Sequence, residues 1–221
     1  KYASYNLIDN SLIDQVKDIE AHKTASFEIL KLYSIFKSGN KNRAIPQSYI
    51  PTQSFFDKIA SFIRLNFFIP DSRIGWNYFA FKKAKKLIEE NNINCVITTG
   101  PPHSSHLIGK KIYNKFKLKW IVDLRDPWAE LFYLKNKFQF NYVKKLNLKF
   151  ELDVLNSADA ILTTVGSRYK TILKDKLSNT KKIYKIYNGY DKIAYDNVEE
   201  IKPDSYNICL LYTSPSPRDT G

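Results

Sequence analysis

The chain has 221 residues, of which 43% are hydrophobic and 26% charged, so it is long enough to bury a core. No apolar run approaches the roughly 20 residues that a membrane helix needs. No secretory leader is visible at the start, and two cysteines (Cys95 and Cys209) give neither a disulfide framework nor zinc-ligand spacing. We therefore expect a globular, cytoplasmic protein.

The formal net charge of +13 has two explanations. It could serve an anionic partner, such as a nucleotide, a phospholipid surface or a nucleic acid. It could also follow from codon bias, because Lys, Asn, Ile and Tyr are all used heavily, as an AT-rich genome would require. The two explanations are compatible.

Helical spacing of apolar residues dominates the first 90 residues. A short helix is predicted near residues 10–16 and a longer one from about residue 24, stopped by the Ser-Gly-Asn at 38–40. Residues 39–51 are polar and carry two prolines, which predicts a loop. Further helices are predicted over 54–66 and 76–90, with a turn at 70–73 between them.

From Cys95 onward, strand and helix patterns alternate. Buried strands are predicted at 95–99, 120–122, 159–164 and 183–187, and helices at about 104–115, 141–156 and 167–176. A strand, a helix and a strand within about 30 residues form a βαβ unit with parallel strands. The predicted fold is therefore α/β, with a Rossmann-like parallel sheet flanked by helices.

The first polar loop, Gly100–His106 (GPPHSSH), follows the first strand. Ser104 or Ser105 can cap the following helix, whose free N–H groups and positive dipole end would suit a phosphate or a sugar hydroxyl. Alternatively, the serines only cap the helix, and His103 and His106 are ordinary loop or core histidines. Two histidines without a third ligand do not make a zinc site, so no metal is predicted.

The second polar loop, Asp123–Trp128 (DLRDPW), ends the next strand. Asp123 or Asp126 could hold a substrate hydroxyl or act as a base, and Arg125 could bind a phosphate in bidentate fashion. Alternatively, an Arg–Asp pair ties the loop down and Trp128 packs over it. Because ligands of parallel sheets collect at the carboxyl ends of the strands, the two loops should lie side by side at one edge.

Several other chemistries lack support in the sequence. There is no G-x-G-x-x-G fingerprint, no P-loop lysine and no glycine elbow around a serine. Tyr and Lys are interleaved widely, which is a weak RNA-binding signal without an accompanying motif. No internal repeat is evident.

Four segments resemble the amino-terminal half of bacterial family 4 glycosyltransferases. They are PDSRIGW (70–76), TTGPPHSSHLIG (98–109), KWIVDLRDPW (119–128) and YNGYD (187–191), and their order and spacing fit as well. The resemblance spans roughly residues 1–208. It implies the GT-B architecture, with two Rossmann-like domains, an acceptor-binding amino-terminal half and a nucleotide-sugar-binding carboxyl-terminal half.

The resemblance also implies a domain plan. Residues 1–203 would be the acceptor-side domain, lacking the family's first strand and Gly-rich loop, and residues 204–208 would begin the donor domain. Residues 209–221 resemble translated adapter sequence, so we expect an artefactual or disordered tail there. The donor-binding glutamates of the family would be missing, and the chain alone should be inactive.

By resemblance, the function is retaining sugar transfer from a nucleotide-sugar donor to a cell-surface polysaccharide or a lipid-linked acceptor, without a cofactor or metal. Asp126 and Asp123 are the candidate catalytic residues. The candidate substrate-binding residues are His103, Ser104, Ser105, Arg125, Trp128 and Asn188.

The basic charge and the aromatic residues would suit peripheral contact with an anionic inner membrane. Two alternatives remain open. One is a GT-B enzyme with different donor chemistry, such as an epimerase-like one. The other is a basic nucleic-acid-binding module, which the missing motifs disfavour, so no nucleic-acid partner is predicted.

Overall fold

A computed structural model of the chain describes residues 17–27, 55–129, 137–164, 167–178 and 182–189. The chain divides into two compact units, residues 1–187 and 188–221. Everything described below lies in the first unit, except Asn188 and Gly189. The helix predicted near residues 10–16, most of the one predicted from about residue 24, and the expected domain boundary at residue 203 lie outside the described residues; residues 24–27 are described and are not helical.

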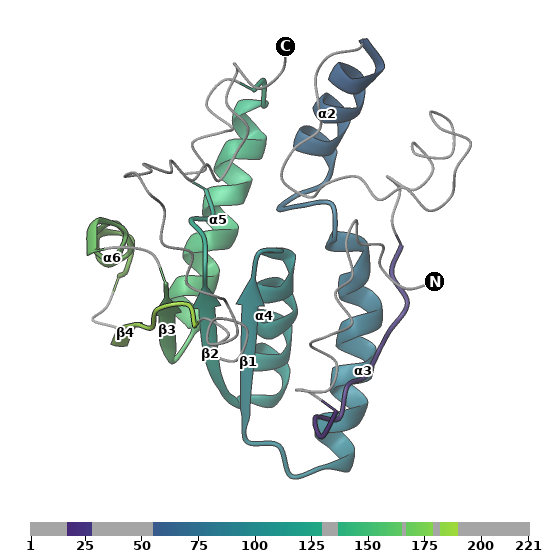
Figure 1. The fold of residues 1–221 in the computed structure, drawn as a ribbon, viewed down its shortest axis with the longest axis vertical. Coiled ribbons are helices and arrows are strands. Elements are labelled where there is room, and N and C mark those ends of the chain that lie inside the picture. Colours follow the sequence, from purple (N-terminus) through teal and green to yellow (C-terminus); the bar gives the residue numbers. More distant parts are fainter. Residues whose placement is uncertain (1–16, 28–54, 130–136, 165–166, 179–181, 190–221) are drawn as a thin grey trace, which may run out of the picture. The chain divides into compact units, whose positions relative to one another are not determined.

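The order of elements confirms the predicted alternation (Figure 1). The helices and strands are α2 (Phe55–Phe67), the 3₁₀ turn η2 (Ile74–Trp76), α3 (Asn77–Glu90), β1 (Cys95–Gly100), α4 (Ser104–Phe116), β2 (Lys119–Leu124), α5 (Asn141–Ser157), β3 (Ala160–Thr163), α6 (Ser167–Asp175) and β4 (Lys182–Lys185). The predicted end of the second strand before Asp123 was wrong. Asp123 still pairs with Thr99 of β1, and the strand ends at Leu124.

All four strands are parallel and lie in the order β1-β2-β3-β4. The register aligns Gly100 with Leu124, and Leu124 with Thr163, so the loops that follow these strands start from one edge of the sheet. This is the α/β, Rossmann-like parallel sheet that the alternating pattern predicted.

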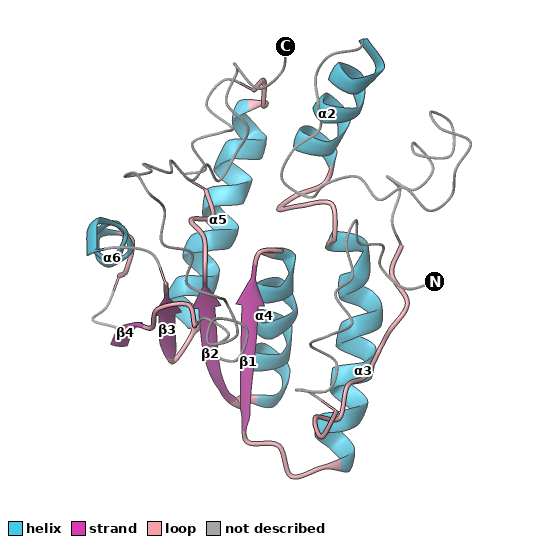
Figure 2. Cartoon of the chain, viewed as in Figure 1, coloured by secondary structure: helices cyan, strands magenta, loops and turns pink. Residues whose placement is uncertain are grey.

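Among the described residues, helices pack on one face of the sheet more than on the other. Helix α4 packs on β1, β2 and α5, and Figure 2 shows α4 and α5 on the same side of the strands. Alternate residues of β2 are buried on this side: Trp120, Val122 and Leu124. The residues between them face the other side, which is more open among the described residues, with 62% of Ile97 exposed.

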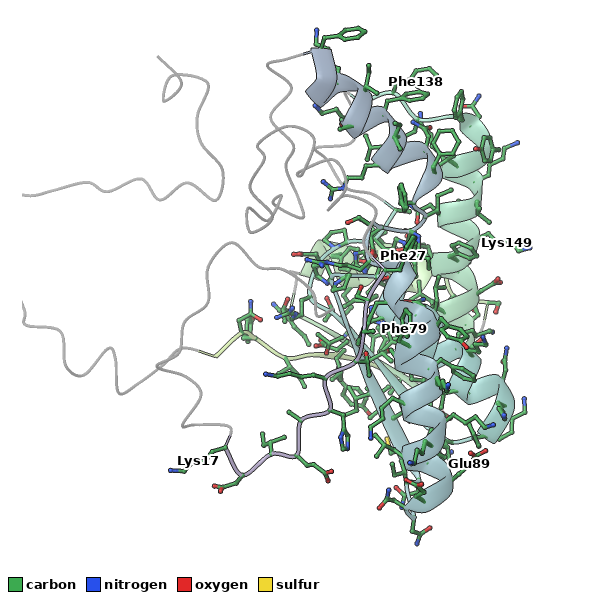
Figure 3. The ribbon with its side chains drawn as sticks, turned by 90° about the vertical axis from the view of Figure 1, so that its right-hand side faces the viewer. Lys17, Phe27, Phe79, Glu89, Phe138 and Lys149 are labelled. Carbon is green, nitrogen blue, oxygen red and sulfur yellow. The ribbon has the colours of Figure 1, made fainter. Side chains whose placement is uncertain are left out.

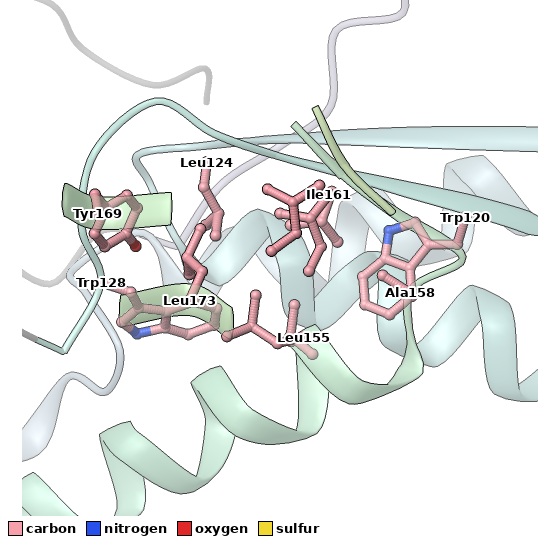
Figure 4. Close-up of a cluster of buried hydrophobic side chains, with 11 residues drawn as sticks. Trp120, Leu124, Trp128, Leu155, Ala158, Ile161, Tyr169 and Leu173 are labelled. Carbon is pink, nitrogen blue, oxygen red and sulfur yellow. The ribbon is translucent and has the colours of Figure 1, made fainter. Parts of the chain in front are cut away.

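The main core lies between the sheet and the helices of its covered face (Figure 4). Trp120, Leu124 and Ile161 come from the strands, Leu155 from α5 and Leu173 from α6. A second cluster packs α3 against α4 through Ala80, Ile108 and Ile112. Side chains of this size stabilise a fold by about 1.5–3 kcal/mol each when fully buried. The packed core therefore fixes the strands and helices from which the loops of the first unit start.

Helix α2 is joined to the start of α5 by polar contacts. Asn66 is buried, accepts a hydrogen bond from the Phe140 N–H (2.8 Å) and donates to the carbonyls of Phe62 (2.9 Å) and Phe138 (3.3 Å). Gln139 donates to the Leu65 carbonyl (3.2 Å). Every helix in the described part of the chain is too short or too polar to cross a bilayer.

Candidate functional site

The two polar loops meet at the carboxyl edge of the sheet, as predicted. The Arg125 N–H donates to the Gly100 carbonyl (3.1 Å), which ties the start of the second loop to the end of β1. The Thr164 hydroxyl donates to the Arg125 carbonyl (2.9 Å), which ties the same loop to the end of β3. Three strand ends therefore fix the backbone from which Arg125 and Asp126 project.

The amino terminus of α4 is capped by a residue from a distant turn. Asp71 accepts hydrogen bonds from the Ser104 N–H (2.8 Å) and the Ser104 hydroxyl (2.9 Å). Asp71 also accepts the Arg73 N–H (2.9 Å), which closes its own turn. The expectation that Ser104 or Ser105 caps the helix was wrong, because neither side chain accepts a capping hydrogen bond.

The same contacts remove the predicted anion site at this helix end. The first three N–H groups are engaged: Ser104 with Asp71, Ser105 with the Pro102 carbonyl (3.2 Å) and His106 with the His103 carbonyl (3.0 Å). A negative charge is stabilising at the positive end of the helix dipole, and the Asp71 carboxylate already supplies it. Ser104 is fully buried, and the Ser105 hydroxyl donates to the Thr99 carbonyl. Both serines therefore anchor the first loop from inside.

His103 lies flat against Trp128 beneath the second loop. The two ring centres are 4.9 Å apart and the planes differ by 7°. His103 Nε2 lies 3.2 Å from the Pro127 carbonyl, which can only accept, so Nε2 carries the proton. Burial lowers the pKa of the His103 imidazole, although Asp71, the Pro127 carbonyl and Asp126 act in the opposite direction. The ring is therefore neutral and joins the two loops.

Trp128 was expected at the surface of the site, but it belongs to the core. Only 1% of its surface is exposed, and its Nε1–H donates to the buried Asn147 of α5 (2.8 Å). The indole is packed, as the alternative expected, but it packs into the core and against α5, and does not cover the loop as a lid.

His106 lies deeper, against the strands. Its Nδ1 is 2.9 Å from the Thr98 hydroxyl, which also accepts the Trp120 Nε1–H (3.0 Å). Burial, with a smaller contribution from His103, lowers the pKa of His106 from 6.5 to about 3. This histidine is neutral at physiological pH and belongs to the core, which was the alternative to a ligand-binding role in the sequence analysis.

Gly100 is required because both histidines approach it. A Cβ at this position would lie 2.5 Å from His106 Nε2 and 3.0 Å from His103 Nδ1. Both are buried ring nitrogens for which the described residues supply no hydrogen-bond partner. A side chain at position 100 would have to displace one of the two buried rings.

The groups that remain accessible to a ligand form what we call the rim: Thr99, Asp123, Arg125 and Asp126. Arg125 and Asp126 are exposed and Asp123 is half-buried. The Thr99 hydroxyl donates to Asp123 (2.9 Å) across the two strands, which orients that carboxylate. No ion pair joins Arg125 to either aspartate, so the predicted alternative of an Arg–Asp tie does not describe this loop.

Two carboxylates and a guanidinium on a fixed backbone suit a polar ligand. Each carboxylate can accept hydrogen bonds from hydroxyl groups, and the guanidinium can hold a phosphate or another carboxylate with two parallel hydrogen bonds. Asn188 is exposed, but it begins the second unit, so its predicted place in the site stays a prediction. Among the described residues, no three side chains of His, Cys, Asp or Glu gather as metal ligands.

Sequence reasoning missed the residues that hold the loops in place. Asp71 was read only as part of a turn, although an aspartate followed by a polar residue is typical of a side chain that bonds nearby backbone. Thr98, Thr99 and Asn147 carried no signal, because their roles depend on partners in other elements. Comparison with protein-family models, curated proteins and solved structures finds no match to this chain.

Proposed function

We propose that the chain is the acceptor-side part of a glycosyltransferase that moves a sugar from a nucleotide-sugar onto a polysaccharide or a lipid-linked acceptor. The observation that carries the proposal is the rim. It presents Asp123, Arg125 and Asp126 together where two loops meet at the carboxyl edge of a parallel sheet, the edge at which such sheets bind ligands. The resemblance of both loops to family 4 glycosyltransferases supports the same assignment.

In this proposal Asp126 accepts a hydrogen bond from the acceptor hydroxyl, and Asp123, oriented by Thr99, holds a neighbouring hydroxyl. The hydroxyl oxygen gives its proton to Asp126 and forms a bond to the anomeric carbon, while the bond from that carbon to the donor phosphate breaks and the nucleoside diphosphate leaves with the bonding electrons. Arg125 faces phosphate, either of the donor or of a lipid-linked acceptor. His103 acts through position only, because it is buried and neutral.

The proposal assigns donor binding to a further Rossmann-like domain of the same gene product, so the assay needs that full product. It would be incubated with membranes and a panel of labelled nucleotide-sugars, including uridine and guanosine diphosphate sugars. Transfer of label from one donor into glycolipid or polysaccharide supports the proposal.

Two results would count against sugar transfer. Interconversion of the nucleotide-sugar without incorporation into an acceptor would identify an epimerase-like enzyme. Absence of both reactions, together with salt-sensitive binding to nucleic acid, would favour a basic binding module.

A further inference from the structure

Two buried histidines each have one polar atom that the described residues leave unpaired. His106 is fully buried and His103 is 6% exposed, and the unpaired atoms are His103 Nδ1 and His106 Nε2. Both lie close to the point where a Cβ of Gly100 would stand, at 3.0 Å and 2.5 Å. Buried polar atoms in folded proteins are nearly always paired with protein groups or with ordered water. Because the two nitrogens converge on one point, one small ligand can pair both.

The contact of His103 with the second loop determines which hydrogen-bonding role its Nδ1 can play. Nε2 lies 3.2 Å from the Pro127 carbonyl, which can only accept, so the ring proton is on Nε2. Burial lowers the pKa of this imidazole, so the ring is neutral and has no second proton. Its Nδ1 therefore presents a lone pair, and His103 offers the ligand an acceptor.

The Thr98 hydroxyl determines the tautomer of His106. Its oxygen accepts the Trp120 Nε1–H (3.0 Å) and lies 2.9 Å from His106 Nδ1. A hydroxyl has one proton to donate, and among the described residues His106 Nδ1 is the acceptor that the Thr98 proton can reach. If Thr98 donates to Nδ1, the proton of the neutral ring is on Nε2. The opposite tautomer would leave the Thr98 proton unpaired in the core and would set two lone pairs against each other.

These hydrogen bonds run in one direction and have one gap. On the near side, Trp120 donates to Thr98, and Thr98 donates to His106. On the far side, His103 donates to the Pro127 carbonyl. The gap lies between a donor, His106 Nε2–H, and an acceptor, His103 Nδ1. A water molecule can accept the first hydrogen bond and donate the second, which makes the chain continuous, and aligned hydrogen bonds strengthen one another.

The space beside Gly100 suits an oxygen atom better than a carbon atom. A carbon at 2.5 Å from His106 Nε2 overlaps the ring, whereas a hydrogen-bonded oxygen approaches a nitrogen to about 2.7–3.2 Å. A metal ion is disfavoured, because a protonated Nε2 is not a ligand. Among the described residues, no third His, Cys, Asp or Glu joins the two histidines.

The surroundings of the two histidines close this point off from solvent. Ser104, which follows His103, is fully buried and is held by Asp71. The turn that carries Asp71 is itself covered, because the Phe27 N–H donates to the Gly75 carbonyl (3.4 Å). Figure 3 shows Phe27 above the label of Phe79, at the start of α3. A water enclosed here should exchange slowly, as buried structural waters do.

We propose that one structural water bridges His106 Nε2–H and His103 Nδ1 beneath the rim. This water joins the core hydrogen bonds of Trp120 and Thr98 to the carbonyl of Pro127, the residue that follows Asp126 of the rim. The site is distinct from the rim and binds a molecule that both donates and accepts a hydrogen bond. The inference does not depend on the proposed sugar transfer.

NMR spectroscopy of the ¹⁵N-labelled full chain at pH 7 tests the proposal, because the chain has only three histidines. Long-range correlations between ring nitrogens and carbon-bound ring protons identify each tautomer. Both buried rings should carry the proton on Nε2 and none on Nδ1. The His106 Nε2–H should also show direct cross-relaxation with a bound water. His22, which is exposed, is the internal control for a ring in contact with solvent.

A matched pair of variants locates the water. Gly100→Ala should abolish the cross-relaxation between water and His106 Nε2–H, because the new Cβ fills the space between the rings. Gly189→Ala, where a Cβ meets nothing within 4 Å, should keep it. If Gly100→Ala does not fold, the wild-type spectrum alone still decides whether the water is present.

Four results would overturn the proposal. The first is a His106 ring with its proton on Nδ1. The second is a scalar coupling between the two unpaired nitrogens, which would show a direct N–H···N hydrogen bond in place of water. The third is a change of the ring ¹⁵N resonances on adding EDTA, which would identify a bound metal ion. The fourth is absence of water cross-relaxation in the wild type, or its retention in a folded Gly100→Ala variant.

Discussion

The carboxylate of Asp71 binds both the backbone N–H and the hydroxyl of Ser104, a residue 33 positions further along the chain. This contact fixes the turn before η2 to the first turn of α4. It also places a negative charge at the positive end of that helix. The first polar loop thus has its position set by a residue outside the βαβ unit.

Replacing Asp71 should therefore weaken the fold more than an ordinary surface change. We expect Asp71→Ala to lower the free energy of unfolding by about 1–2 kcal/mol, the range measured for lost helix caps. Asp71→Asn keeps an acceptor oxygen and should cost less. Urea denaturation measures both. Asp175→Ala, at an exposed position of α6, is the control, and an equal loss in the control would contradict the capping role.

The βαβ unit itself could be predicted from the sequence, because the apolar patterns of β1, α4 and β2 are local. The cap from Asp71 could not, since its partner is 33 positions away. Trp128 and His103 were candidate substrate-binding residues because they stand in polar loops, yet their rings stack on each other and Trp128 belongs to the core. The pattern of α2 predicts a helix, but it cannot show that the apolar side is left exposed.

Gly100 offers a second test, of the packing between the two histidines. Gly100→Ala should lower the free energy of unfolding by about 1–3 kcal/mol, because the new Cβ overlaps His106 Nε2. Combining it with His106→Ala should give a smaller loss than the sum of the two single changes. Gly189→Ala, where a Cβ meets nothing within 4 Å, is the matched control. If the two losses are additive in the double variant, the His106 ring is not the group that excludes a side chain at position 100.

The buried histidines predict how stability changes with pH. The pKa of His106 is about 3 in the folded chain and 6.5 for the free side chain, so between these values the unfolded chain binds a proton that the folded chain does not. Stability should therefore fall as the pH drops below about 6.5, by about 1.4 kcal/mol per pH unit for this group. The lowered pKa of His103 acts in the same direction.

Urea denaturation at pH 7 and pH 5 measures this dependence. The loss of stability between the two pH values should be about 2 kcal/mol smaller in His106→Gln than in the wild type. His22→Gln, at a histidine outside this packing, should lose as much as the wild type. An unchanged loss in His106→Gln would mean that this ring is charged in the folded protein.

We propose that the rim, and not the buried histidines, meets the acceptor. Asp126 projects from a backbone held by Gly100 and Thr164, so its side chain can be shortened without disturbing the core. In the full gene product, Asp126→Ala should lower the rate of sugar transfer by about 10²-fold or more, the range for a positioned acid–base group. Its unfolding free energy should stay within about 0.5 kcal/mol of the wild type.

The most direct measurement is the rate of label transfer to acceptor, compared between wild type, Asp126→Ala and the control Asp175→Ala at equal folded concentration. We expect a large loss in Asp126→Ala alone. Wild-type turnover in Asp126→Ala, or an equal loss in the control, would show that Asp126 does not act on the acceptor.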